Sequence, residues 1–294
     1  MKKQLLAAAV TSVLFSSALL AATGPVPKQL AGPADDIASM RLPDPAAAAI
    51  HSKSALIAVE MLADKAGRQQ WQMSLPTETS DLRFLVFSGE ASGWDVEIGN
   101  PDGSSNNAKS LARQVRNTEF GLLGESFPAQ QFDLVGLSGE RTLKLSAQLD
   151  QERGGFVLVE GDASTELASY PAHRNQKVGA RMGIVAMLTD GSDAALSGEA
   201  KLGNAAGRIQ HASLRVTSPN GAVEIHPMFD DGLHADSDAN DGIYGGDFAT
   251  PQEGAWLAQV VVRGTNAAGR SLIRTAEHVI PVVTPTIELA TDKA

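Results

Sequence analysis

Apolar and polar residues alternate one by one along much of the chain from about residue 68 onward, a pattern typical of half-buried β-strands. Around residues 94–98, Trp94, Val96 and Ile98 fall on one face and Asp95 and Glu97 on the other, before a Pro-Asp-Gly turn. Residues 142–149 repeat the alternation. Short strands with frequent turns, and no intervening helices long enough for crossovers, predict antiparallel sandwiches.

A second series of strands begins near residue 180. Met182, Ile184 and Leu188 share one face, a Ser-Pro-Asn-Gly turn at 218–221 indicates a hairpin, and residues 256–262 alternate again. Roughly seven short strands in about 105 residues is the size of an immunoglobulin-like domain. We therefore predict an all-β protein with two tandem antiparallel β-sandwich domains of this type.

The first residues predict a secretory signal peptide. Lys2 and Lys3 precede an apolar run from Leu5 to Leu20, small residues follow, and Pro25 comes next. This is the order of regions in a signal peptide, and the run is short for a membrane span. We expect cleavage near Ala22, with Gly24 as the other choice. The alternative is an uncleaved anchor. No later run has spanning length, so we expect no transmembrane segment after cleavage and an exported protein, periplasmic or extracellular.

Two segments are less regular. Residues 44–67 are rich in alanine, with Asp44 as a candidate helix cap and Gly67 as a stop, so they predict either a short helix or an edge strand at 55–62. Residues 101–130 are polar and are expected to form a loop around a small helix. The expected divisions are a signal peptide at 1–22, a leader at 23–67, a first sandwich at 68–167, a linker at 168–177, a second sandwich at 178–284 and a tail at 285–294.

Charge and cysteine content exclude several classes of function. The net charge is −10 and the chain has no cysteine. An acidic chain without a basic cluster is a poor partner for nucleic acid or for anionic membranes, because both require clustered positive charge. The absence of cysteine excludes disulfides and thiolate metal sites.

The densest chemistry lies in residues 229–248, FDDGLHADSDANDGIYGGDF. Clustered carboxylates suit calcium, which takes about six to eight oxygen ligands. Aspartates also cap turns by accepting hydrogen bonds from neighbouring backbone N–H groups, without any metal. Both interpretations stay open. An EF-hand is rejected because Asp241 stands where that loop needs glycine and strands flank the segment. The candidate calcium ligands are Asp230, Asp231, Asp236, Asp238 and Asp241. In the calcium interpretation, Asp230→Asn or Asp236→Asn lowers the melting temperature only when calcium is present.

This loop and the strands around it carry a resemblance to a known module. Residues 230–248, followed by EGAWLAQVVVRG and GRSLIRTAEHVIPV, resemble the "DDG…D…DGIY" β-sandwich module of secreted and cell-surface proteins. The chain as a whole resembles the secreted proteobacterial domain-of-unknown-function family 4785. The resemblance covers about 178–283 and implies an immunoglobulin-like fold; it establishes neither calcium binding nor a catalytic role. Ala235 stands where the module usually has glycine.

Catalytic signatures are absent from the sequence. It has no HExxH, no G-x-S-x-G and no phosphate-binding loop. His226 and His278 lie in strand-like stretches and are expected to face solvent, while Trp71, Trp94 and Trp256 lie on apolar faces and are expected in cores. Two hypotheses follow. The first is an exported, non-catalytic binding or cell-envelope module for an extracellular protein or glycan. The alternative is an exported hydrolase of glycans or peptides with a carboxylate-based site between the domains.

Overall fold

The structure is a computed structural model that describes residues 49–284, apart from 64–67, 89–92, 123–124, 148–153, 162–163, 173–175, 191–206 and 237. The expected signal peptide, most of the leader and the tail lie outside the described residues. The described elements are nearly all strands, and every named strand pair is antiparallel. The predicted all-β fold with two tandem immunoglobulin-like sandwiches is confirmed.

Two five-stranded sheets form the N-terminal domain. One has the order β2 (Ser54–Glu60), β11 (Gly154–Glu160), β5 (Leu82–Phe87), β9 (Glu125–Leu134) and β8 (Ala112–Leu122). The other has the order β3 (Leu62–Ala63), β4 (Gln69–Ser74), β10 (Thr142–Ala147), β6 (Asp95–Gly99) and β7 (Ser105–Asn107). A single turn of helix, α3 (Ala108–Leu111), joins β7 to β8.

Two four-stranded sheets form the C-terminal domain. One has the order β1 (Ile50–Ser52), β12 (Thr165–Pro171), β13 (Arg181–Asp190) and β16 (Ile243–Ala249). The other has the order β15 (Val223–Pro227), β14 (Ile209–Thr217), β17 (Gly254–Thr265) and β18 (Ser271–Val282). Since β1 belongs to this domain and β2 to the other, the chain crosses between the domains at Lys53.

The structure decides one open alternative and differs from two local expectations. Of the helix and the edge strand that the alanine-rich stretch allowed, the strand is found: β2 is an edge strand, because its pairing with β11 overrides helix propensity. In the expected loop at 101–130, the small helix is α3, but the residues from 112 onward belong to the β8–β9 hairpin, in which the edge strand β8 has many exposed side chains. Residues 168–171 of the expected linker lie in β12, which pairs with both β1 and β13.

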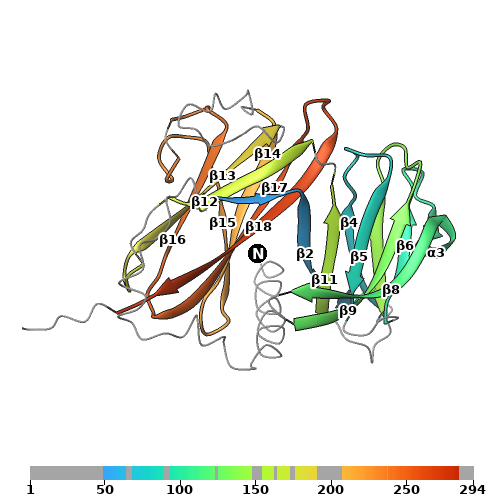
Figure 1. The fold of residues 1–294 in the computed structure, drawn as a ribbon, viewed down its shortest axis with the longest axis horizontal. Helices are drawn as coiled ribbons and strands as arrows, with labels where there is room; N and C mark the ends of the chain where they lie inside the picture. Colours follow the sequence, from blue (N-terminus) through green and yellow to red (C-terminus); the bar gives the residue numbers. More distant parts are fainter. Residues whose placement is uncertain are drawn as a thin grey trace, which may run out of the picture.

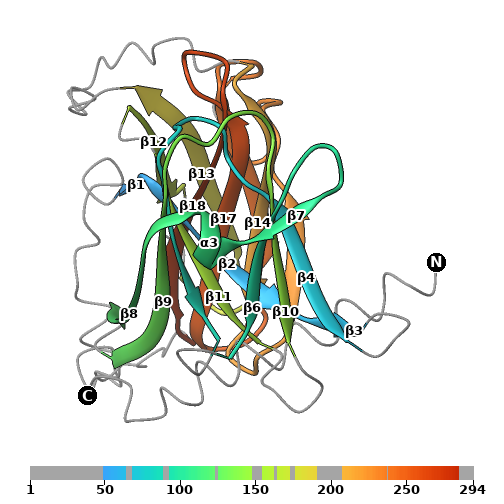
Figure 2. The same ribbon diagram turned by 90° about the vertical axis from the view of Figure 1, so that its right-hand side faces the viewer.

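The alternating residues supply both cores. Trp94, Ile98 and Leu145 are buried in the N-terminal core, against which Trp71 packs, and Trp256 and Phe248 are buried in the C-terminal core. The expected place of the three tryptophans is thus confirmed. Figure 1 shows the two sandwiches side by side, with β2 and β18 at their boundary. Figure 2 shows the N-terminal strands in front of the orange and red strands of the C-terminal domain.

Candidate functional site

The acidic loop connects β15 to β16 and is fixed at both ends. Phe229 and Gly245 exchange two backbone hydrogen bonds of 2.8 Å. The His234 ring lies against the Phe229 ring at a tilt of 43°, with ring centroids 4.8 Å apart. The His234 carbonyl lies so close to Gly245 that a Cβ there would come within 2.0 Å of its oxygen. Only glycine therefore fits at position 245, and the loop is packed against the start of β16.

Four of the five candidate aspartates cap turns within the loop. Asp230 accepts hydrogen bonds from the amides of Asp241 (3.1 Å) and Gly242 (3.0 Å), which ties the two ends of the loop together. One Asp236 oxygen accepts from the amides of Asp231 (2.8 Å) and Gly232 (2.9 Å). Backbone N–H donors stabilise the charged form of a carboxylate, and they do so without a cation.

Asp231 and Asp241 cap shorter turns. Asp231 accepts from the amide of Leu233 (3.0 Å) and contacts the His234 ring nitrogen Nδ1 at 3.0 Å. The contact with His234 is the largest cause that holds the pKa of Asp231 below its usual value. Asp241 accepts from the amide of Ile243 at 2.9 Å. Asp238 is exposed, and no hydrogen bond of its carboxylate is found among the described residues.

Two residues of the loop other than glycine have a positive backbone φ angle. Ala235 has φ 72° and Asn240 has φ 64°. Asparagine tolerates this left-handed region, whereas alanine is strained there because of its Cβ. Glycine would adopt it freely, which gives a physical reason for the glycine usual at position 235 in the resembling module.

The five aspartates lie at separate turns of the loop, and nowhere in the described ranges do three or more acidic or histidine side chains gather for a metal. One oxygen, Oδ1 of Asp236, is buried without a hydrogen bond to a described residue. The hydrogen bonds match the turn-capping interpretation.

The domain junction brings together polar residues that no sequence motif marked. Arg274 of β18 and Glu78 form a two-pronged ion pair, with both N–O distances 2.6 Å and both side chains fully buried. Arg274 also donates to the carbonyl of Thr165 at 3.0 and 3.1 Å. The only local signal for this pair was a charged residue inside the apolar stretch SLIRTAEHVIPV.

Further hydrogen bonds join the domains beside this pair. The amides of Thr77 and Glu78 both donate to the carbonyl of Ser271 at 3.0 Å. The free edge of β2 is capped by side chains of the other domain: the Leu56 amide donates to Thr275 (2.8 Å), and Gln259 donates to the Leu56 carbonyl (3.0 Å). Ile273 of β18 is buried in the N-terminal core. The two domains therefore share one packed boundary.

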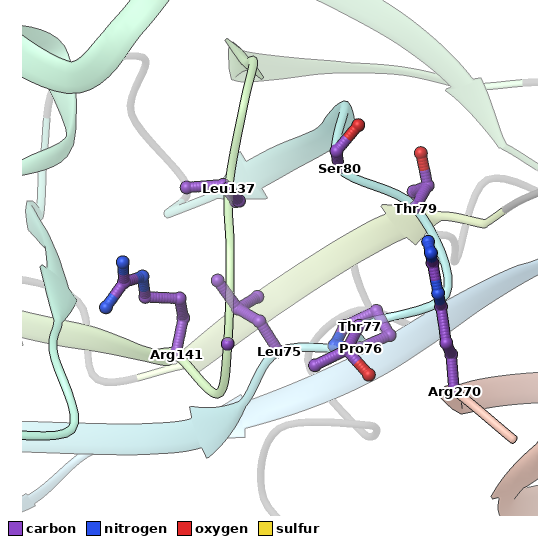
Figure 3. Close-up of a pocket in the computed structure, with 9 residues that line it drawn as sticks. Leu75, Pro76, Thr77, Thr79, Ser80, Leu137, Arg141 and Arg270 are labelled. Carbon is purple, nitrogen blue, oxygen red and sulfur yellow. The ribbon is translucent and has the colours of Figure 1, made fainter.

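A pocket of about 360 Å³ opens next to this boundary (Figure 3). Its lining combines apolar groups, hydroxyls and two arginines, Arg141 and Arg270. None of the described residues that line it carries a carboxylate or an imidazole group. The lining residues are Leu75, Pro76, Thr77, Thr79, Ser80, Leu137, Gly139, Arg141 and Arg270.

The expectation that His278 faces solvent is wrong. His278 is buried rather than exposed, and its ring contacts the Ser169 hydroxyl at 2.8 Å. Burial lowers the pKa of His278 to about 4. Ser169 is itself fully buried, so this pair has no access to a substrate. His226 is partly exposed at the edge strand β15, beside Glu224.

Comparison with known proteins follows the same division into two domains. Residues 54–159 match the family model described as the conditioned medium factor first Ig-like domain, and residues 165–282 match its second Ig-like domain. The chain carries the paired Ig-like domains of the conditioned medium factor family. It is 26% identical to the conditioned medium factor of Dictyostelium discoideum over 98% of this chain and 46% of that relative. The chain thus spans about half the length of that conditioned medium factor.

A solved structure supports the fold. The DUF4785 family protein of Legionella pneumophila superimposes with a TM-score of 0.51 at 10% identity, covering 80% of this chain and 61% of that one. At this identity the match shows a shared fold alone. It agrees with the expected resemblance to that family. No helix in the described part of the chain is long and apolar enough to cross a membrane.

Proposed function

We propose that this chain is an exported, non-catalytic binding module whose recognition surface is held rigid by the junction of its two domains. The name of the relative, conditioned medium factor, supports a place outside the cell. The proposal that the module is non-catalytic rests on the lining of the junction pocket. Among the described residues, this lining contains arginines, hydroxyls and apolar groups, but no carboxylate and no histidine. Such a lining can hold a ligand, but it cannot shuttle protons for hydrolysis.

The partner in this proposal is an extracellular or cell-envelope protein or glycan. The test is to incubate the purified protein with chromogenic glycosides, esters and a fluorogenic peptide library, and to probe glycan and peptide arrays with the labelled protein. We expect saturable binding on an array and no turnover of any substrate. Turnover by the wild type that disappears in Arg270→Ala would overturn the non-catalytic proposal.

Calcium binding at the five aspartates stays a prediction. The backbone hydrogen bonds of Asp230 and Asp236 account for the form of the loop without a cation. Calorimetric titration of calcium into the purified protein, with magnesium as the comparison, decides it. Heat of binding that is seen with calcium but not with magnesium, and that is lost in Asp236→Asn, would support a calcium site. Identical titration curves for the two metals would rule out a calcium-specific site.

A further inference from the structure

We propose that the junction pocket binds a small organic anion, with its charged group on the arginines and its body on the apolar floor. This inference rests on the proposed function as a binding module and names the ligand class. Pockets at domain boundaries that combine an apolar surface with a few polar groups are the usual places for small ligands. A volume of about 360 Å³ lies near the lower end of the range for such sites, so the ligand is compact.

The charge of the pocket opposes that of the chain. The net charge of the chain is −10, yet the pocket lining holds two arginines and no acid. The carboxylate of Asp81, next to the lining residue Ser80, accepts hydrogen bonds from the amide of Gly136 (3.2 Å) and the hydroxyl of Ser80 (3.4 Å). A local positive region on an acidic surface concentrates single anions, while an extended polyanion is repelled by the rest of the molecule.

The free hydrogen-bonding capacity belongs to the arginines. Thr77 shares its hydroxyl with Ser271 (2.9 Å), and the Thr79 hydroxyl donates to the carbonyl of Asp81 (3.0 Å). Within the described residues, neither guanidinium group of the pocket makes a hydrogen bond or a close ion pair. The pKa of Asp102 is lowered mainly by its hydrogen bonds with Ser104 and to a smaller extent by the charge of Arg141. Guanidinium groups bind carboxylates, sulfonates and phosphates through paired N–H donors, so they are the groups left to recognise an oxyanion.

The arrangement of the side chains suits a ligand with an apolar body. Figure 3 shows the Arg270 side chain extending toward Thr79, whereas the Arg141 guanidinium lies on the other side of Leu75 and Leu137. The two leucines, with Pro76, form the apolar part of the lining between the two cations. An anion bound at Arg270 would therefore place its body against Leu137 and Leu75.

Both arginines stand on fixed backbone. Asn266 accepts hydrogen bonds from the amides of Ala268 and Arg270, each at 3.0 Å, and its own amide donates to the Arg270 carbonyl at 2.9 Å. The Arg141 carbonyl accepts from the amide of Leu75 at 2.8 Å. The neighbouring bonds between Thr77 and Ser271 hold the two walls together. Binding thus costs mainly side-chain ordering, which favours affinity.

The test uses 8-anilinonaphthalene-1-sulfonate, an aromatic sulfonate, and N-phenyl-1-naphthylamine, the same skeleton without the charge. Fluorescence titration of the folded wild type should give saturable binding of the sulfonate. Because a hydrogen bond to a charged group contributes substantially, Arg270→Ala should weaken sulfonate binding about tenfold or more. Arg270→Lys should weaken it less, and Arg141→Ala should weaken it to a smaller degree than Arg270→Ala. Arg181→Ala, on the far side of the C-terminal domain where Arg181 pairs with Asp247, is the matched control and should leave it unchanged.

The charge dependence gives the second readout. Loss of Arg270 should not weaken binding of the neutral amine, and amide chemical shifts of Thr77, Leu137 and Gly139 should move on sulfonate addition. Equal sulfonate affinity in wild type and Arg270→Ala, absence of saturable binding, or shifts confined to another surface would each overturn the proposal. Denaturation curves check that every variant is folded. If the sulfonate does not bind, the anion site is wrong but the proposed non-catalytic function is unaffected. If the protein turns over a substrate, the non-catalytic function is wrong but the anion site is unaffected.

Discussion

The acidic loop and the domain junction use charge in opposite ways. The loop gathers five aspartates within twelve residues, and four of them accept hydrogen bonds from the amides of the loop's own turns. The junction uses one fully buried ion pair between residues 196 positions apart. The aspartates of the loop are close together in the sequence and act only within the loop. The two residues of the buried ion pair are far apart in the sequence and hold the two domains together. Density of charge along a chain is therefore a poor guide to the charges that organise the molecule.

Breaking the junction pair should have the largest effect. Glu78→Gln leaves the guanidinium of Arg274 buried without its counter-charge, and loss of one partner of a buried pair costs about 3–5 kcal/mol. Denaturant unfolding monitored by tryptophan fluorescence measures the loss. The double variant Glu78→Leu/Arg274→Met removes both charges and should recover much of the stability. Equal stability of Glu78→Gln and the wild type would contradict the role of the pair.

A buried histidine on the same strand should make stability depend on pH. Burial lowers the pKa of His278 from 6.5 to about 4 in the folded chain, so the unfolded chain binds the proton more tightly between these pH values. Stability should therefore fall as pH drops from 6.5 to 4, by about 3 kcal/mol from this group. Unfolding curves over this range measure the slope. In His278→Gln that component of the slope should vanish; an unchanged slope would show that other groups cause it.

In the loop, removing a turn cap should cost less. Asp230→Asn replaces one of two acceptor oxygens by an NH₂ group that faces a backbone N–H, for a loss of about 1–3 kcal/mol. Because the cap does not need a metal, the melting temperature should fall equally with calcium and with chelator. A fall seen only with calcium would favour the calcium interpretation instead. Asp238→Asn, at an exposed position, is the matched control and should stay within about 0.5 kcal/mol of the wild type.

The smallest effect should come from the strained backbone of the loop. Ala235→Gly relieves a left-handed conformation that costs an alanine about 1–2 kcal/mol, and the flexibility of glycine in the unfolded chain cancels part of the gain. We expect a stability increase of up to about 1 kcal/mol by denaturant titration. Asn240→Gly is the comparison, since asparagine tolerates this conformation and should gain less. A destabilised Ala235→Gly would show that the loop does not carry this strain.

The fold was predictable because alternation is a local signal. Residues 94–98 and 142–147 became β6 and β10 with the expected faces buried. The alanine-rich β2 and the polar β8 were harder, since edge strands of this composition take their form from the neighbours with which they pair. The turn caps of the loop were one of two readings that the aspartates allowed.

The junction was not predictable from local pattern. Glu78 follows a Pro-Thr loop, and Arg274 lies in a strand that otherwise reads as apolar. Their pairing depends on how the two sandwiches meet. The same is true of the pocket, because Thr77 and Leu137 line it from one domain and Arg270 from the other. His278 was expected at the surface because alternation shows which residues share a face. It does not show whether a second element covers that face.

The packed boundary should make the two Ig-like domains one rigid unit. Residual dipolar couplings of backbone amides in a weakly aligned sample test this rigidity. A single alignment tensor, oriented on the structure as a whole, should fit the amides of both domains. Two tensors of clearly different magnitude or orientation, one for residues 54–160 and one for 165–282, would contradict it.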